Sequence, residues 1–141
     1  LAQREANPAG DDAPLFLIIM GLHRFRDLRR SDDFSFGSES EKPAPDKQFA
    51  RILREGPALG IHTIAWCDTA ANLERTLDRQ SIREFEARVL FQMSANDSTA
   101  LVDAPAAANL GRYRAILYRE ELGTIEKFRP YAMPPSEWLA G

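Results

Sequence analysis

The sequence predicts an α/β protein with a mostly parallel sheet, flanked by helices and followed by a C-terminal hairpin. Apolar segments with the length and composition of buried strands occupy residues 15–20, 61–67 and 87–93. Segments of helical spacing lie between them, and this alternation favours helices packed in layers on parallel strands. Two more strand-like segments, on either side of residues 121–123, predict the hairpin.

The first strand, residues 15–20, is a run of apolar residues that ends at Gly21. The segment that follows has an apolar residue at every third position, which predicts a short helix with one apolar face. Residues 31–45 are polar, with serine, glycine and proline among them, so we expect a flexible loop there.

The second strand has helical segments on both sides. Residues 46–55 carry apolar side chains at helical spacing, with Asp46 as the candidate N-cap and the Gly-Pro pair at 56–57 as the terminator. The strand itself covers residues 61–67. Residues 71–86 again have helical spacing and predict one or two helices.

The third strand, residues 87–93, is followed by two short helical segments. Asp97 or Ser98 is the candidate N-cap of the first, because both side chains can accept a hydrogen bond from a backbone N–H. Residues 105–111 predict the second, which the glycine at its end closes before the hairpin.

The composition fits one modest domain without a membrane-spanning segment. The 141 residues include 18 lysines and arginines against 21 acidic residues, so the chain as a whole has no basic field to attract nucleic acid, although local basic patches remain. The one cysteine, Cys67, cannot form an internal disulfide, which fits a reducing compartment. We expect residues 1–141 to form a single, soluble, cytoplasmic domain with no membrane contact from this segment.

The chain starts at Leu1 rather than at methionine, and we interpret it as a piece cut from a longer protein. That parent protein can itself be tethered to a membrane. Its remaining sequence is the information that would most help to define the function of this piece.

Three segments share their order and many residues with one known family. Residues 51–66 read RILREGPALGIHTIAW, residues 87–103 read ARVLFQMSANDSTALVD, and residues 106–118 read AAANLGRYRAILY. In this order they resemble the FtsK/SpoIIIE superfamily of P-loop motor ATPases, which are relatives of HerA. The resemblance covers the carboxyl-terminal half of the family's motor domain and implies a partial RecA-like P-loop NTPase core. It also implies that the parent protein binds ATP and magnesium and forms a homo-oligomeric ring.

Two departures from the family pattern concern its nucleotide site. No glycine of this sequence is followed by lysine, so the loop that would cradle phosphates is absent, and we expect no ATP or magnesium to bind to this fragment. The resemblance also places Met20 at the position of the Walker B acid. A thioether is a soft ligand, whereas magnesium requires oxygen ligands, so Met20 cannot hold that ion.

The resemblance places Met20, Cys67 and Asp68 near the nucleotide. Asp68 and Asp27 are the candidates to replace the missing catalytic acid. The alternatives remain open: Asp68 can cap a loop, Met20 and Cys67 can fill core space, and no motif suggests an activated thiol. His23 is interpreted as a surface residue, and no spacing indicates a metal site.

Two arginine clusters are the candidate phosphate-binding or ring-interface residues. The first contains Arg24 and Arg26 and the second Arg112 and Arg114. Arginine can bind nucleic-acid phosphates or reach into a neighbouring subunit as an arginine finger. The alternative for both clusters is a solvated surface paired with nearby acids.

Three functions are compatible with these features. The first is part of a DNA-translocating ATPase motor with a degenerate Walker B strand. The second is a non-catalytic module for oligomerisation or partner binding. The third is a degenerate ATPase domain of a type VII-like secretion motor, whose substrate is protein, and the segment at residues 55–62 fits that branch slightly better than the DNA branch.

Overall fold

The computed structural model describes residues 1–6, 13–31 and 43–139. It divides into two compact units, Leu1–Phe85 (unit 1) and Glu86–Gly141 (unit 2), each with its own sheet. Most of the expected flexible loop at 31–45 lies outside the described residues. The expectation of a single domain over residues 1–141 stays a prediction.

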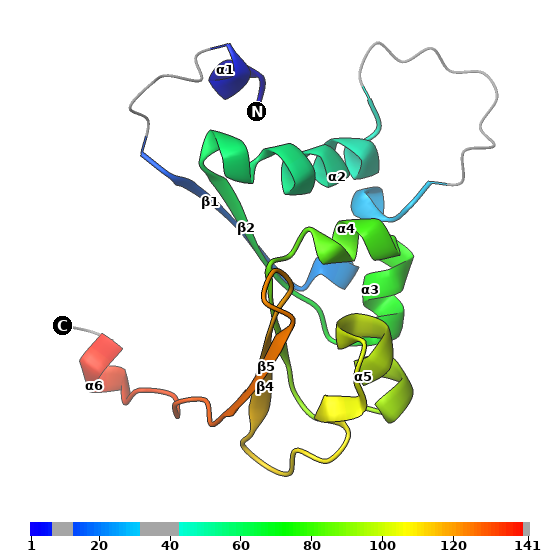
Figure 1. The fold of residues 1–141 in the computed structure, drawn as a ribbon. Coiled ribbons are helices and arrows are strands. Elements are labelled where there is room, and N and C mark those ends of the chain that lie inside the picture. Colours follow the sequence, from blue (N-terminus) through cyan, green and yellow to red (C-terminus); the bar gives the residue numbers. More distant parts are fainter. Residues whose placement is uncertain (7–12, 32–42, 140–141) are drawn as a thin grey trace. The chain divides into compact units, whose positions relative to one another are not determined.

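Unit 1 contains the parallel strand pair that the sequence predicts. β1 (Leu15–Met20) pairs with β2 (Ile61–Trp66) over its whole length. α2 (Pro45–Glu55) contacts β2 and lies at an angle to the two strands, and the 3₁₀ helix η3 (Pro57–Leu59) leads into β2 (Figure 1). The other helices of the unit are α1 (Ala2–Glu5), η1 (Leu22–Arg24), η2 (Arg26–Leu28), α3 (Ala70–Thr76) and α4 (Arg79–Arg83).

The segment after β1 does not form the single helix that its spacing predicts. It forms two 3₁₀ turns, η1 and η2, which Phe25 separates in an extended conformation. Because a 3₁₀ helix has three residues per turn, an apolar residue at every third position suits this geometry as well. Leu22 in the first turn is fully buried, and it anchors the segment in the core of unit 1.

α2 confirms the predicted amphipathic helix but begins differently. Phe49 and Leu53 lie one turn apart and are both buried. The helix begins with Pro45, whose fixed φ and missing N–H suit the first position, so the prediction of Asp46 as N-cap is wrong. The Asp46 carboxylate instead accepts hydrogen bonds from the backbone N–H and the hydroxyl of Ser31, at 3.0 and 2.7 Å.

The region predicted to hold one or two helices, residues 71–86, forms two, each with a side-chain cap. Thr69 Oγ1 accepts the N–H of Asn72 at 3.2 Å at the start of α3. Asp78 Oδ1 accepts the N–H of Ser81 at 2.7 Å at the start of α4. The hydrogen bonds from Ser81 lower the pKa of Asp78 because they favour the charged carboxylate.

Removing the Asp78 cap is expected to destabilise unit 1 in a pH-dependent way. Asp78→Ala should lower the free energy of unfolding at neutral pH by about 1 kcal/mol, the usual cost of a lost N-cap. Since the native pKa of Asp78 lies below its ordinary value of 3.8, the contribution is present above that value and is lost as the pH falls through the native pKa. Urea unfolding at neutral and acidic pH measures both effects.

Asp78→Asn is the matched control for this prediction, because asparagine keeps the oxygen acceptor but does not titrate. It should retain most of the stability at neutral pH. A difference between the alanine variant and the parent that stays constant from neutral to acidic pH would contradict the assignment.

Unit 2 is a three-stranded antiparallel sheet in the order β3-β4-β5. β4 (Ala115–Arg119) and β5 (Thr124–Phe128) confirm the predicted C-terminal hairpin. β3 (Ala87–Leu90) differs from the prediction, since it pairs antiparallel with β4 instead of joining a mostly parallel set. An apolar run predicts a strand, but its partner and direction depend on how the connection returns the chain. The helices are α5 (Ala95–Val102), η4 (Pro105–Ala107) and α6 (Ser136–Leu139).

Two serines fix the helical part of unit 2. Ser94, and not the predicted Asp97 or Ser98, caps α5, because its hydroxyl accepts the N–H of Asp97 at 3.1 Å. Ser98 is fully buried, and its hydroxyl donates to the Ala104 carbonyl at 2.6 Å and accepts the N–H of Ala107 at 3.1 Å. Ser98 therefore holds η4 against α5.

Candidate functional site

The carboxyl ends of β1 and β2 lie at the same edge of their sheet because the strands are parallel. The N–H of Gly21 donates to the Trp66 carbonyl at 3.1 Å and extends the ladder by one residue. Gly21 has a φ of 86°, in the left-handed region, and a Cβ there would lie 3.2 Å from the Arg24 side chain. This turn brings His23 beside the end of β2. Ligands commonly bind at such edges in open α/β sheets.

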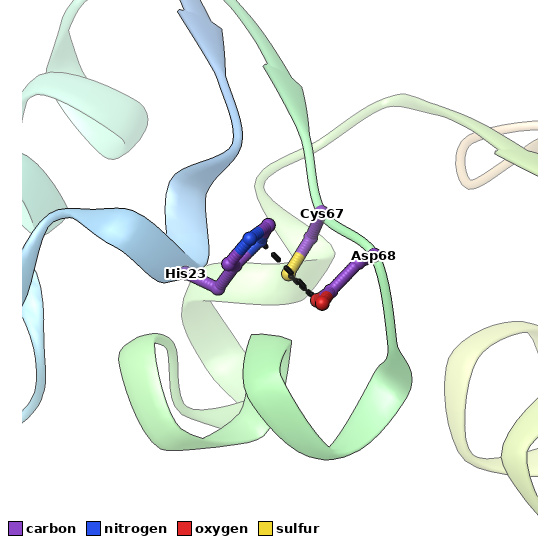
Figure 2. Close-up of side chains that lie close together, drawn as sticks. All are labelled: His23, Cys67 and Asp68. Carbon is purple, nitrogen blue, oxygen red and sulfur yellow. Dashed lines mark hydrogen bonds and ion pairs between the residues drawn. The ribbon is translucent and has the colours of Figure 1, made fainter.

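Three side chains meet at this edge: His23 from η1, and Cys67 and Asp68 from the loop after β2 (Figure 2). One ring nitrogen, the thiol sulfur and one carboxylate oxygen all lie within 4.8 Å of one another. His23 Nδ1 is 3.2 Å from Asp68 Oδ1, and the Cys67 thiol donates to the same oxygen at 3.8 Å. The structure thus brings the predicted Cys67 and Asp68 together, and adds a histidine.

Asp68 is ionised and held at the start of α3. Its Oδ1 accepts hydrogen bonds from Asn72 Nδ2 at 2.9 Å and from the Thr69 hydroxyl at 3.4 Å. The bond from Asn72 is the main cause that lowers the pKa of Asp68, and the charge of His23 lowers it further. These contacts tie Asp68 to the first turn of α3, and both alternatives for its role stay predictions.

Cys67 and His23 are held less firmly than Asp68. Burial is the main cause that raises the pKa of the Cys67 thiol, and the charge of Asp68 raises it further, so this thiol is not an activated nucleophile. His23 Nδ1 is buried and makes no hydrogen bond within the described part of the chain, although it lies within ion-pair distance of Asp68. The distance to Asp68 is short enough for a hydrogen bond, but the alignment is not. The ring packs edge-on against Trp66, with centroids 5.9 Å apart.

The predicted residues Met20 and Asp27 lie outside this cluster. Met20 is the last residue of β1, directly opposite Trp66, and is 68% exposed. Asp27 is exposed in η2 and belongs to no group of metal-ligating side chains among the residues that the structure describes. The structure therefore does not bring Asp27 into the cluster.

The first arginine cluster is solvent-exposed. The side chain of Arg24 lies over Gly21, and Arg26 is exposed in η2. A Cβ at position 21 would lie 3.2 Å from the Arg24 side chain, so that side chain would have to shift if Gly21 were substituted. Arg24 and Arg26 are not among the residues that line the hollow described next.

The second arginine cluster lines an open hollow in unit 2, here called the basic hollow. It has a volume of about 430 Å³ and is lined by Arg112, Arg114, Lys127, Phe128 and Arg129. The hairpin register explains the grouping, because Ala115 pairs with Phe128 and so the segment before β4 lies beside the end of β5. No acidic side chain is among the lining residues.

Three residues of these sites with a charged or titratable side chain are not found by the sequence analysis: His23, Lys127 and Arg129. The interpretation of His23 as a surface residue is wrong, since its side chain is only 20% exposed. Its position depends on the left-handed turn at Gly21, for which the glycine at a strand end is the available signal. For the other two, the signal is basic residues two apart in an extended segment, Lys127 in the second hairpin strand and Arg129 directly after its end.

The architecture is a mixed α/β fold with a parallel strand pair, and it matches part of an NTPase fold. No protein-family model matches the chain. The genome packaging NTPase B204 from Sulfolobus turreted icosahedral virus 2, solved in complex with AMP, superposes with a TM-score of 0.57 and 14% identity over 85% of this chain and 55% of that chain. The same protein in complex with ATP-gammaS gives a TM-score of 0.55 and 15% identity, over 83% of this chain and 52% of that chain.

The chain spans about half the length of these solved structures. At this identity the similarity shows the fold alone, and it confirms the fold class that the sequence predicts. A shorter match reaches the human PAN2-PAN3 deadenylation complex catalytic subunit PAN2, with 31% identity over 62 residues, which are 44% of this chain but 5% of that protein. In the described part of the chain, no helix has the length and apolar character to cross a membrane.

Proposed function

We propose that this chain is the carboxyl-terminal half of an FtsK/SpoIIIE-like, ATP-driven DNA translocase motor domain with a degenerate Walker B strand. The observation that carries the proposal is Met20, a residue without a carboxylate, at the carboxyl edge of the parallel strand pair in a fold similar to that of a packaging NTPase. In this proposal the parent protein binds ATP and magnesium, works in the cytoplasm and forms a ring of identical subunits.

The contacts at the strand ends support low hydrolytic activity of this subunit. The thioether of Met20 is a poor ligand for magnesium, which prefers oxygen. Asp68 shares its cluster with a histidine and a thiol, which are not the oxygen ligands that magnesium requires, and Asp27 is not in the cluster. A magnesium-binding acid would therefore have to come from another part of the parent protein.

The exposed face of the strand pair supports the view that more of the motor domain covers it. Phe16, Ile18 and Met20 alternate along β1 on one face, and Ile64 and Trp66 lie opposite Ile18 and Met20 on β2; all five are exposed. Two-stranded sheets are only marginally stable in water and need further strands or helices packed on them. The fit to about half of each packaging NTPase chain agrees with this interpretation.

The basic hollow of unit 2 supports a DNA substrate. Its four cationic side chains come from the segment before β4 and from the end of β5 and the residue after it, and no acidic side chain is among the lining residues. Clustered arginine and lysine bind phosphates of the DNA backbone irrespective of sequence, as a translocase requires.

Restoring a carboxylate at position 20 tests the proposal. In the full-length parent protein, Met20→Asp should raise magnesium-dependent ATP hydrolysis by about tenfold or more, because an oxygen ligand returns to the metal. The matched control is Ile18→Asp, which puts the same charge on the same strand face, two residues from the strand end, at a similar exposure of 61%. The measurement is the steady-state rate of phosphate release with and without DNA.

An increase for Met20→Asp but not for Ile18→Asp supports the proposal. If neither variant hydrolyses faster than the parent while both remain folded, then Met20 does not occupy the acid position or the acid is supplied elsewhere. That result, together with failure to bind DNA, would favour the second candidate function, a non-catalytic module that docks a partner on the exposed apolar face of β1 and β2.

A further inference from the structure

The cluster of His23, Cys67 and Asp68 has a feature that neither loop capping nor nucleotide binding explains. The buried Nδ1 of His23 makes no hydrogen bond within the described part of the chain, yet it faces a thiol and a carboxylate. A buried polar atom normally makes a hydrogen bond, whereas Nδ1 is in ion-pair contact with Asp68 at 3.2 Å without the alignment of one. We propose that His23, Cys67 and Asp68 bind one Zn²⁺ ion through an imidazole nitrogen, a thiolate and a carboxylate oxygen.

The spacing of the three groups fits tetrahedral coordination. With Zn–N and Zn–O bonds of about 2.1 Å, the two ligand atoms are about 3.4 Å apart, and a thiolate at about 2.3 Å lies about 3.6 Å from the oxygen. The corresponding distances are 3.2 Å between His23 Nδ1 and Asp68 Oδ1, and 3.8 Å between Cys67 Sγ and the same oxygen. The ring nitrogen of His23 and Cys67 Sγ lie within 4.8 Å of each other, where a tetrahedral site has about 3.6 Å.

The donor set selects the metal. Nitrogen, sulfur and oxygen ligands together suit the borderline-soft Zn²⁺, whereas Mg²⁺ and Ca²⁺ require oxygen ligands alone. Three protein ligands leave the fourth tetrahedral position open to a water molecule. On binding, the Cys67 S–H bond breaks, an S–Zn bond forms, and the proton goes to the buffer.

The surroundings of the site support the ligand geometry. Asn72 donates to Asp68 Oδ1, and Arg75 in turn donates to Asn72 Oδ1 at 3.2 Å. Such outer contacts orient a ligating carboxylate before the metal arrives. The metal would join the turn after β1 to the loop after β2, two segments far apart in the sequence. This inference does not depend on ATP hydrolysis, so it can fail or succeed independently of the proposed function.

Cobalt(II) titration of the untagged, reduced 141-residue chain tests the proposal, because Co²⁺ reports its own ligands in its absorption spectrum. We expect a thiolate-to-cobalt charge-transfer band that saturates at one equivalent and is displaced by Zn²⁺, which binds such sites more tightly than Co²⁺. Since the chain has one cysteine, this band can arise only from Cys67. Sedimentation of the loaded chain establishes whether it is a monomer.

Two ligand variants and one control sharpen the test. Cys67→Ser should abolish the charge-transfer band, and His23→Gln should weaken Co²⁺ binding at least about tenfold. His62→Gln is the matched control, because His62 is an exposed histidine of the same unit and outside the cluster, and it should change the affinity less than about twofold. No band with excess Co²⁺ on a chain that circular dichroism shows to be folded would overturn the proposal. Two chains per metal in a dimer would overturn it equally.

Discussion

Replacing Leu22 by alanine is expected to lower the free energy of unfolding of unit 1 by about 2–5 kcal/mol. The Leu22 side chain is 0% exposed, between the left-handed Gly21 and the half-buried His23. Removing its branched end takes apolar surface out of the core and leaves a cavity that the neighbouring 3₁₀ turn fills only in part. The free energy of unfolding of a whole small domain is about 5–15 kcal/mol, so this one substitution removes a large fraction of it.

Leu15→Ala is the matched control, because it makes the same chemical change in the same unit at a leucine that is 53% exposed. It should lower the free energy of unfolding by less than about 1 kcal/mol, as surface substitutions usually do. Urea unfolding followed by circular dichroism measures both variants against the parent chain. Equal losses for the two leucines would show that the turn after β1 is not anchored in the core.

The secondary structure was largely predictable because it depends on local apolar patterns. Residues 15–20 are a run of apolar residues and residues 61–67 are mostly apolar, and both form strands close to the expected bounds. The hairpin around residues 121–123 is confirmed for the same reason. The partner of β3 was not predictable, since strand pairing depends on contacts remote in the sequence.

Helix starts were the least predictable part of the fold. Asp46, Asp97 and Ser98 have suitable side chains for caps, but the choice depends on which residue leaves helical geometry. Ser94 caps α5, and a proline begins α2. For α5, the sequence pattern does not distinguish the serine that caps the helix from the aspartate and the serine that follow it.

The candidate site was predictable only where strand topology determines it. Cys67 and Asp68 follow a strand, and parallel pairing places the end of β1 beside them. His23 joins them because Gly21 turns the chain in the left-handed region, which a period of three apolar residues does not reveal. Asp27 lies only four residues beyond His23, yet η2 carries it out of the cluster.

Removing two positive charges from the basic hollow is expected to change how DNA binding depends on salt. If the four cations of the hollow each contact one phosphate, the logarithm of the affinity for duplex DNA should fall with the logarithm of the salt concentration with a slope of about −3.6. In the double variant Arg112→Gln, Arg114→Gln, two contacts remain and the slope should be about −1.8. With equal affinities at 1 M salt, this difference corresponds to about 60-fold weaker binding at 0.1 M.

The control must remove the same charge from elsewhere, because any loss of positive charge weakens attraction to DNA in general. The double variant Arg54→Gln, Arg119→Gln does so, since Arg54 lies on α2 and Arg119 at the end of β4, and neither lines the hollow. Fluorescence anisotropy with a labelled duplex at several salt concentrations yields both slopes. A shallower slope for the Arg112 and Arg114 variant alone locates the phosphate contacts in the hollow. Equal slopes for the two variants would mean that binding follows net charge, and the hollow would then have no specific part in holding DNA.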